Sequence, residues 1–269
     1  MNRAAMAAMT TMIALSTTAP AGAQTLYRPP RQGQSTDQLN ADKGRCTGWA
    51  LGAVLAAMVA VAPLAAAQDI ETQAVREGLV EVEDTKVDIA YMRPGIDWSR
   101  YASIQLRPLT VTEEARDATP ESVRVRSYPG ESWVLRDKDV KVLEDEFARI
   151  MRRELEKGGY SFVDEAGADT LIIVPALIDI YMTAPLEDTR RTATARGGTF
   201  TEYSGSLTIA VALADGQTGT VIARGVDTRY PTRMWRENTR VRNISDVRQI
   251  YGAWGRQLRK RLQELRSGP

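Results

Sequence analysis

Apolar side chains recur with helical spacing in two segments of the chain. Between residues 137 and 157 they fall three or four positions apart and form one stripe, and the same spacing returns between residues 245 and 265. Asp137 and Ser245 stand where a helix N-cap belongs, and Gly158-Gly159 follows the first stripe. The pattern therefore predicts two amphipathic helices, each with one face against a core.

Alternation of apolar and polar residues predicts strands elsewhere. The expected strands are 102–107, 160–163, 170–182, 202–214 and 220–228. Segment 170–182 begins apolar on both faces, so we expect an interior strand, in which Pro175 requires a bulge or an unpaired N–H. Residues 215–219, DGQTG, predict the turn of a hairpin between the last two strands.

This order of elements predicts an α/β (α+β) fold, a mixed β-sheet of about five strands with two amphipathic helices packed on one face. We expect a single α/β envelope domain over residues 89–266, preceded by a flexible lead-in, 68–88, that is acidic and weakly patterned. The stretch 110–136 lacks periodicity and is expected to be a long loop in which Trp133 anchors the packing.

An export signal is predicted upstream of this domain. Residues 43–67 combine a basic start, an uncharged apolar run and a final run of three alanines. Cleavage after Ala67 would leave Gln68 as the mature N-terminus. The alternative is a retained anchor, because 47–67 is 21 uncharged residues and can span a bilayer. Its many alanines make it weakly apolar for a permanent span, and no basic stop signal follows it, so we favour the cleaved signal.

The first 42 residues contain a further signal-like segment, 1–24, followed by a polar stretch. Two export signals in tandem make little mechanical sense, so we expect translation to start near Leu39. We therefore treat residues 1–67 as a signal region outside the fold. The expected location is the periplasm or the envelope, and the inner membrane if 47–67 is retained.

Composition excludes several classes of chemistry. The chain has no histidine, and its single cysteine, Cys46, precedes the apolar run, where it can serve neither a disulfide of the mature part nor lipid attachment. Most zinc sites and histidine-dependent nucleophiles are thereby excluded, and we expect no metal and no cofactor. Asp179 and Glu202 are candidate acids for a carboxylate-based hydrolase of cell-wall glycan. The alternative places Asp179 at a strand end facing solvent.

The densest charge feature lies between residues 229 and 242. Overall charge is balanced, with 35 Lys and Arg against 34 Asp and Glu, which gives no reason to expect nucleic acid binding. Arginine mixed with aromatic residues is typical of a surface for an envelope protein, peptidoglycan or anionic lipid. The candidate partner-binding residues are Arg229, Tyr230, Arg233, Trp235, Arg236 and Arg240. The alternative is a solvated connector whose arginines pair with local acids.

Four segments carry a resemblance to a known family. They are YMRPGIDWSRYASIQLRPLTV from Tyr91, ELEKGGYSFVDEAGADTLII from Glu154, SGSLTIAVALADGQTGTVIARGVD from Ser204, and the last helix around Trp254. Together they resemble the bacterial lipoprotein-like family called domain of unknown function 3313. The resemblance implies the fold and offers no catalytic residues, and the chain departs from the family by lacking a lipid-attachment cysteine.

These observations favour a non-enzymatic exported protein, a binding or assembly accessory of the envelope that contacts its partner through residues 229–242. The carboxylate-based hydrolase is the alternative, and a module that binds its own copies is a third hypothesis.

Overall fold

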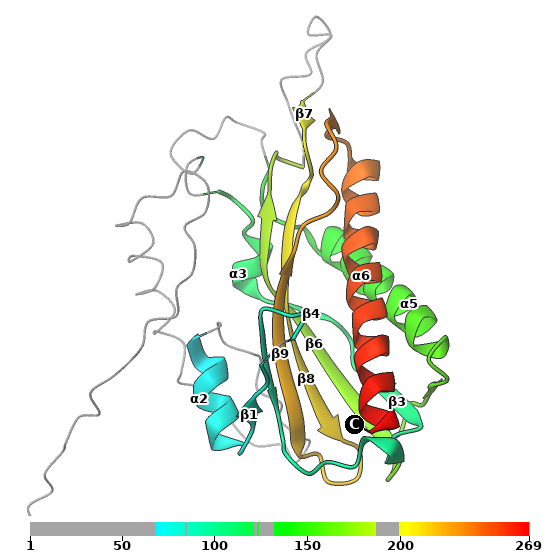
Figure 1. Cartoon of the computed structure of the whole chain (residues 1–269). Coiled ribbons are helices and arrows are strands. Elements are labelled where there is room, and N and C mark those ends of the chain that lie inside the picture. Colours follow the sequence, from blue (N-terminus) through cyan, green and yellow to red (C-terminus); the bar gives the residue numbers. More distant parts are fainter. Residues whose placement is uncertain (1–67, 84, 121–122, 124–131, 187–198, 269) are drawn as a thin grey trace, which may run out of the picture.

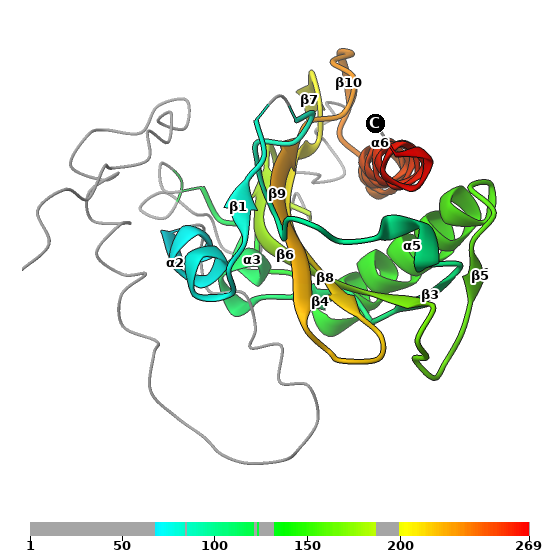
Figure 2. The ribbon, with the colours of Figure 1, turned by 60° about the horizontal axis from the view of Figure 1, so that its bottom comes forward.

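A mixed β-sheet separates two layers of helices in the computed structural model (Figure 1). Helices α5 (Asp137–Glu156) and α6 (Arg240–Ser267) cover one face, and the short α2 (Gln68–Arg76) and α3 (Glu113–Arg116) lie on the other (Figure 2). The described residues are 68–83, 85–120, 123, 132–186 and 199–268. The predicted fold class, a mixed sheet with two amphipathic helices on one face, is confirmed.

The sheet has the order β1-β2-β9-β8-β6-β3-β5, and β4 also pairs with β6. Its long central strands are antiparallel neighbours, whereas β3, β4 and β5 run parallel to the strands they pair with. The strands are β1 (Val80–Glu81), β2 (Ile89–Met92), β3 (Ser103–Leu106), β4 (Thr110–Val111), β5 (Ser161–Phe162), β6 (Thr170–Met182), β8 (Gly205–Asp215) and β9 (Val221–Arg229). A separate two-stranded ribbon joins β7 (Phe200–Thr201) to β10 (Arg236–Glu237).

All five predicted strands are present in the sheet. Strand β6 has the predicted bounds, and the hairpin of β8 and β9 turns at the predicted residues. Asp215 holds that turn, because its Oδ1 accepts hydrogen bonds from the backbone N–H groups of Gln217 and Thr218 at 3.1 and 2.8 Å. Strand β2 was not predicted, since its four residues show too short a pattern to separate from the loop around them.

Pro175 is accommodated without a bulge at its own position. The backbone carbonyl of Ile173 accepts from the N–H of Arg107 on the β3 side, and alternation directs the nitrogen of Pro175 to that same side. Pairing with β3 ends at Ile173 and pairing with β4 resumes at Ala176, so the missing N–H falls between the two short strands. Of the two predicted arrangements, the structure therefore shows the one without a paired N–H at Pro175, and the bulge of β6 lies farther along, between Leu177 and Asp179.

The segment expected to be a flexible lead-in, residues 68–88, instead contains helix α2 and strand β1. Ile70 and Ala74 of α2 are buried, and they pack with Ala210 of β8 and Val226 of β9 in a second, smaller core. The alanines on this face of β8 leave room for the helix. The expectation failed because only two positions of α2 face the sheet, which is too few to produce an apolar stripe.

The stretch expected to be a loop, residues 110–136, contains β4 and α3 among its described residues. Thr112 caps α3 by accepting a hydrogen bond from the N–H of Ala115 at 3.2 Å. Trp133 is 6% exposed and belongs to the main core, which confirms its predicted role as a packing anchor.

Both long helices were predicted, but their starts differ from the expected caps. Arg136, not Asp137, precedes α5, and its backbone N–H donates to Asp139 Oδ2 at 3.2 Å. Helix α6 begins at Arg240, five residues before the expected start, because Thr239 caps it by accepting from the N–H of Arg242 at 3.2 Å. Part of the predicted connector is therefore helical.

Helices α5 and α6 run in the same direction and pack through aromatic side chains. The rings of Phe147 and Tyr251 meet edge to face at 5.2 Å, and Tyr251 stacks with Trp254 at 5.9 Å. Glu146 of α5 bridges the pair, because it contacts Arg149 on its own helix and lies 2.5 Å from Arg248 of α6. These contacts join the two helices into one layer.

The ion pairs of Glu146 make the free energy of unfolding depend on pH. The hydrogen bond from Arg248 lowers the pKa of Glu146 from 4.5 to about 2. A lowered carboxyl pKa contributes stability above the unfolded value and loses it as pH falls through the folded value. We expect Glu146→Gln to cost about 1 kcal/mol at neutral pH, since both arginines are half exposed.

The melting temperatures of the two proteins should converge between about pH 4.5 and about 2. Thermal unfolding followed by circular dichroism over that range measures the difference. Glu264→Gln, which breaks an exposed pair with Arg261, is the control and should show a much smaller difference. A constant difference between Glu146→Gln and wild type across the range contradicts the prediction.

Candidate functional site

Two chain segments form an arm that extends past the long strands beside the start of α6 (Figure 1). We define the arm as residues 199–204, which include β7, and residues 230–239, which include β10. The N–H of Met234 donates to the carbonyl of Glu202, and that of Asn238 donates to Thr199, each at 2.7 Å. The two segments are thus hydrogen-bonded to each other along the arm.

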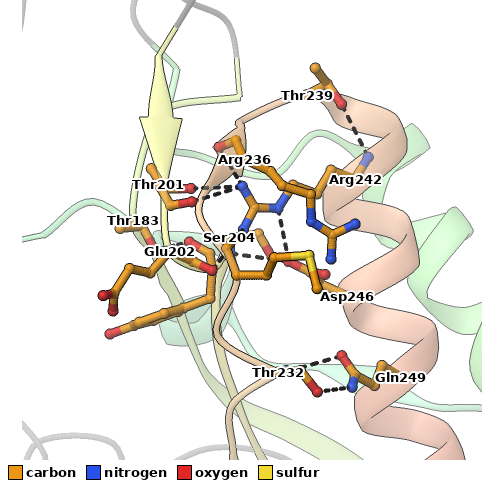
Figure 3. A network of polar contacts seen from close by, with 12 residues as sticks. Thr183, Thr201, Glu202, Ser204, Thr232, Arg236, Thr239, Arg242, Asp246 and Gln249 are labelled. Atoms are coloured by element: carbon orange, nitrogen blue, oxygen red, sulfur yellow. Dashed lines mark hydrogen bonds and ion pairs between the residues drawn. The ribbon is translucent and has the colours of Figure 1, made fainter.

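A buried arginine from α6 holds the arm together. Arg242 is 7% exposed, and its Nη1 donates to the carbonyls of Thr201 and Arg236 at 2.9 and 2.6 Å. Its Nη2 donates to the carbonyls of Glu202 and Met234, each at 2.8 Å. One guanidinium therefore bridges both segments of the arm (Figure 3). Such a fork of donors fixes the relative position of the two segments.

Further contacts fix the base of the arm to the sheet and to α6. Asp246 lies 3.6 Å from Arg242 and accepts from the N–H of Ser204 at 3.2 Å. Gln249 accepts from the N–H of Thr232 at 3.0 Å, as Figure 3 shows. Thr183, just after β6, donates its hydroxyl to the carbonyl of Tyr203 at 2.8 Å. The arm is therefore anchored to two other parts of the fold, α6 and the end of β6.

Two of the predicted partner-binding arginines are engaged inside the protein. Arg229 belongs to β9, where its Nε lies 2.6 Å from Asp227, and it also contacts Gln257 of α6. Arg240 begins α6 and reaches Asp139 of α5 at 2.8 Å. For these two residues the structure supports the alternative interpretation, in which the arginines pair with local acids.

The other four predicted residues lie together on the arm. Trp235 and Tyr230 are 67% and 56% exposed. Arg233 and Arg236 are exposed as well, and neither makes an ion pair within the part of the chain that the structure describes. The guanidinium of Arg233 lies 5.7 Å from the ring of Tyr203, which also meets Tyr230 edge to face. The structure thus brings aromatic rings and unpaired cations onto one surface.

Sequence reasoning missed several members of this surface. Phe200 and Met234 are 52% and 51% exposed on the arm, and Val241 is 80% exposed on the first turn of α6. Arg242, the residue that organises the arm, lay in the predicted segment but was not singled out. The available signal was its spacing, three residues after a capping threonine and four before Asp246.

The candidate acids of the alternative hydrolase do not form a buried pair. Asp179 lies half-buried on β6, after the bulge, and Glu202 is exposed on the arm. Asp227 is more deeply buried than either candidate acid. Burial raises its pKa, although Arg229 and the indole N–H of Trp254 donate hydrogen bonds to its carboxylate. With its Oδ2 between two donors, Asp227 joins β9 to α6.

Residues 71–258 match the family model described as Protein of unknown function (DUF3313). The chain belongs to this family. The match confirms the resemblance predicted from the strand and turn patterns, and it includes most of α2 and the whole arm. No curated protein matches the chain.

Among solved structures, this DUF3313 chain is similar to the PelC dodecamer from Paraburkholderia phytofirmans, with 11% identity and a TM-score of 0.31. That match covers 63% of this chain and 96% of the other. A DUF330 protein from Xanthomonas campestris shows 10% identity and a TM-score of 0.35, with coverage of 62% and 86%. Both likenesses are distant.

No helix within the described ranges is long and apolar enough to cross a membrane. The signal region, including the alternative anchor 47–67 and the cleavage residue Ala67, lies outside the described residues. Gln68, the expected mature N-terminus, is the first residue of α2.

Proposed function

We propose that this DUF3313 protein is an exported, non-enzymatic accessory of the cell envelope that binds its partner through the arm. One observation carries the proposal. Trp235, Met234 and Tyr230 are exposed on the same arm as Arg233 and Arg236, which make no ion pair with the described residues, and a buried arginine fixes the shape of this arm. Exposed tryptophan, tyrosine and arginine dominate binding energy at interfaces, and a rigid binding surface loses little conformational entropy on association.

The predicted export signal supports an envelope partner, because a processed chain would meet its partners outside the cytoplasm. The side chains of the arm suit binding of a partner better than catalysis. Its exposed charged groups are two guanidinium groups and the carboxylate of Glu202, and no buried carboxylate lies among its described residues. Binding is the function that this arrangement supports best.

The test is to change Arg233, Trp235 and Arg236 together to alanine. Loss of one tryptophan hot spot alone costs about 2 kcal/mol, or about thirtyfold in affinity. We therefore expect the variant to leave the envelope fraction in a wash of roughly 1 M salt, which wild type should survive through its apolar contacts. Quantitative immunoblotting of the washed fractions measures the retained share.

A matched control changes Val75, Arg76 and Arg107 to alanine, which also removes one exposed apolar residue and two exposed arginines, at sites away from the arm. The control should be retained like wild type, and both variants should melt like wild type. Equal retention of the arm variant and wild type would refute the proposal. Self-association of the pure protein through the arm would also contradict it, since the partner would then be a second copy.

A further inference from the structure

Basic side chains gather where α5 and α6 both end, at the opposite end of α6 from the arm. Helix α6 has 28 residues, which corresponds to about 42 Å. We define the basic end by six residues: Arg152, Arg153 and Lys157 of α5, with Arg256, Lys260 and Arg266 of α6. Five of them are exposed and Arg266 is half-buried. The two helices run in the same direction, so their C-terminal halves lie side by side (Figure 1).

Contacts place three of these side chains, taken from both helices, around one acidic residue. Glu154, buried between the helices, lies 2.7 Å from Lys157 and 3.6 Å from Arg153, and its carboxylate also interacts with the charge of Arg256. Lys260 follows Arg256 by one helical turn and shares its face. Three cations from two helices thus surround a single buried carboxylate.

The positive charge exceeds what the fold itself uses. Glu154 neutralises one charge, the exposed Glu156 on α5 a second, and the negative ends of the two helix dipoles about one more. Of six cations, about three remain without a counter-charge. The segment that follows β5, which contains Asp164 and Glu165, runs away from α6 (Figure 2). In a chain with balanced total charge, this surplus is a local accumulation at one end of the molecule.

The form of the site favours phosphate groups spread over a surface. The cations are exposed and come from two helices, so they can contact several anions at once without enclosing any. The nearby aromatic faces are covered, since Arg152 lies 4.7 Å over the ring of Phe162 and Arg266 lies 5.0 Å over that of Tyr160. A sugar would therefore find no ring to stack on, whereas guanidinium groups suit phosphate oxygens.

We propose that the basic end binds the anionic phospholipid headgroups of a membrane surface, a second binding site distinct from the arm. The protein would then lie against a membrane through the C-terminal half of α6 and present the arm beside the first turn of α6, about 24 to 39 Å along the helix axis from Arg256 and Arg266. This site does not depend on what the arm binds.

The test measures sedimentation of the processed protein with phosphatidylcholine vesicles, with and without phosphatidylglycerol. We expect binding only when phosphatidylglycerol is present, and a loss of binding as salt increases. Changing Arg152, Arg256 and Lys260 to glutamine should weaken binding roughly a hundredfold, because each basic residue near an anionic surface contributes about fivefold. None of the three makes a direct ion pair among the described residues, and Glu154 keeps both of its ion pairs on α5, so the melting temperature should fall only slightly.

The matched control changes Lys86, Arg107 and Lys138 to glutamine, which removes the same charge from exposed positions elsewhere, and should bind like wild type. Equal weakening by both variants, or equal binding to the two kinds of vesicle, would overturn the proposal. Release by inorganic phosphate beyond that by chloride at equal ionic strength would overturn it too, in favour of a discrete phosphate site. The arm variant, with Arg233, Trp235 and Arg236 changed to alanine, should still bind the vesicles, which separates this proposal from the function of the arm.

Discussion

Replacing Arg242 with alanine is expected to lower the free energy of unfolding by about 3 kcal/mol. The guanidinium donates to four backbone carbonyls of the arm, from Thr201, Glu202, Met234 and Arg236, and it lies beside the buried Asp246. Alanine would leave those carbonyls without their donor and the carboxylate without its only nearby cation in the described structure. Urea unfolding of the two proteins measures the loss.

Two further variants distinguish the bonds of Arg242 from its charge. Arg242→Lys keeps a positive charge near Asp246, but a single ammonium cannot span both segments of the arm, so we expect it to recover less than half of the loss. Arg261→Ala on the same helix removes an exposed arginine and should cost under about 1 kcal/mol. If Arg242→Ala were as stable as Arg261→Ala, Arg242 could not be the residue that fixes the arm.

Replacing Gly205 with alanine is expected to cost more than about 3 kcal/mol. Gly205 begins β8 directly after the arm and pairs with Met182 of β6. A Cβ at this position would overlap the backbone carbonyl oxygen of Tyr181, and the φ of 154° is one that residues with side chains rarely adopt. Relief would require β8 to separate from β6 where the arm leaves the sheet.

Gly225 in the neighbouring strand provides the matched comparison. A Cβ there would meet the carbonyl of Ile89 at 3.5 Å, which is an ordinary van der Waals distance, so Gly225→Ala should change stability by less than about 1 kcal/mol. Thermal and urea unfolding of both variants test the pair. Similar losses at the two glycines would show that the close approach at Tyr181 does not determine the effect.

The six predicted partner-binding residues show which part of a binding surface a charge pattern can predict. Their common feature in the sequence is arginine mixed with aromatic residues, and four of them do share one surface. Arg229 and Arg240 differ in that each pairs with an acid inside the fold. Arg229 pairs with Asp227, two residues earlier on the same strand, and Arg240 pairs with Asp139 of α5. The pair of Arg240 could not be read from the sequence, because its partner lies about a hundred residues away.

The basic end was visible in sequence only as a cationic C-terminal half of the last helix, a pattern that the helix dipole explains by itself. The pattern has a different interpretation once the cations of α5 are included. Arg152, Arg153 and Lys157 precede Arg256 by about a hundred residues, and packing of α5 against α6 places them beside it. The surplus of charge exists only after that packing.

The sequence by itself determined the elements whose pattern is long and periodic. Helix α5, the interior strand β6 and the hairpin of β8 and β9 followed from apolar spacing and turn residues, because burial of one face imposes a repeat on many positions. The family followed from the resemblance of four segments. Tertiary structure decided the rest. Helix α2 packs through too few residues to show a stripe, and the arm is held together because Arg242 joins the segment just before α6 to one about forty residues away. Contacts between residues far apart in the chain leave no periodic trace, so only the folded chain reveals them.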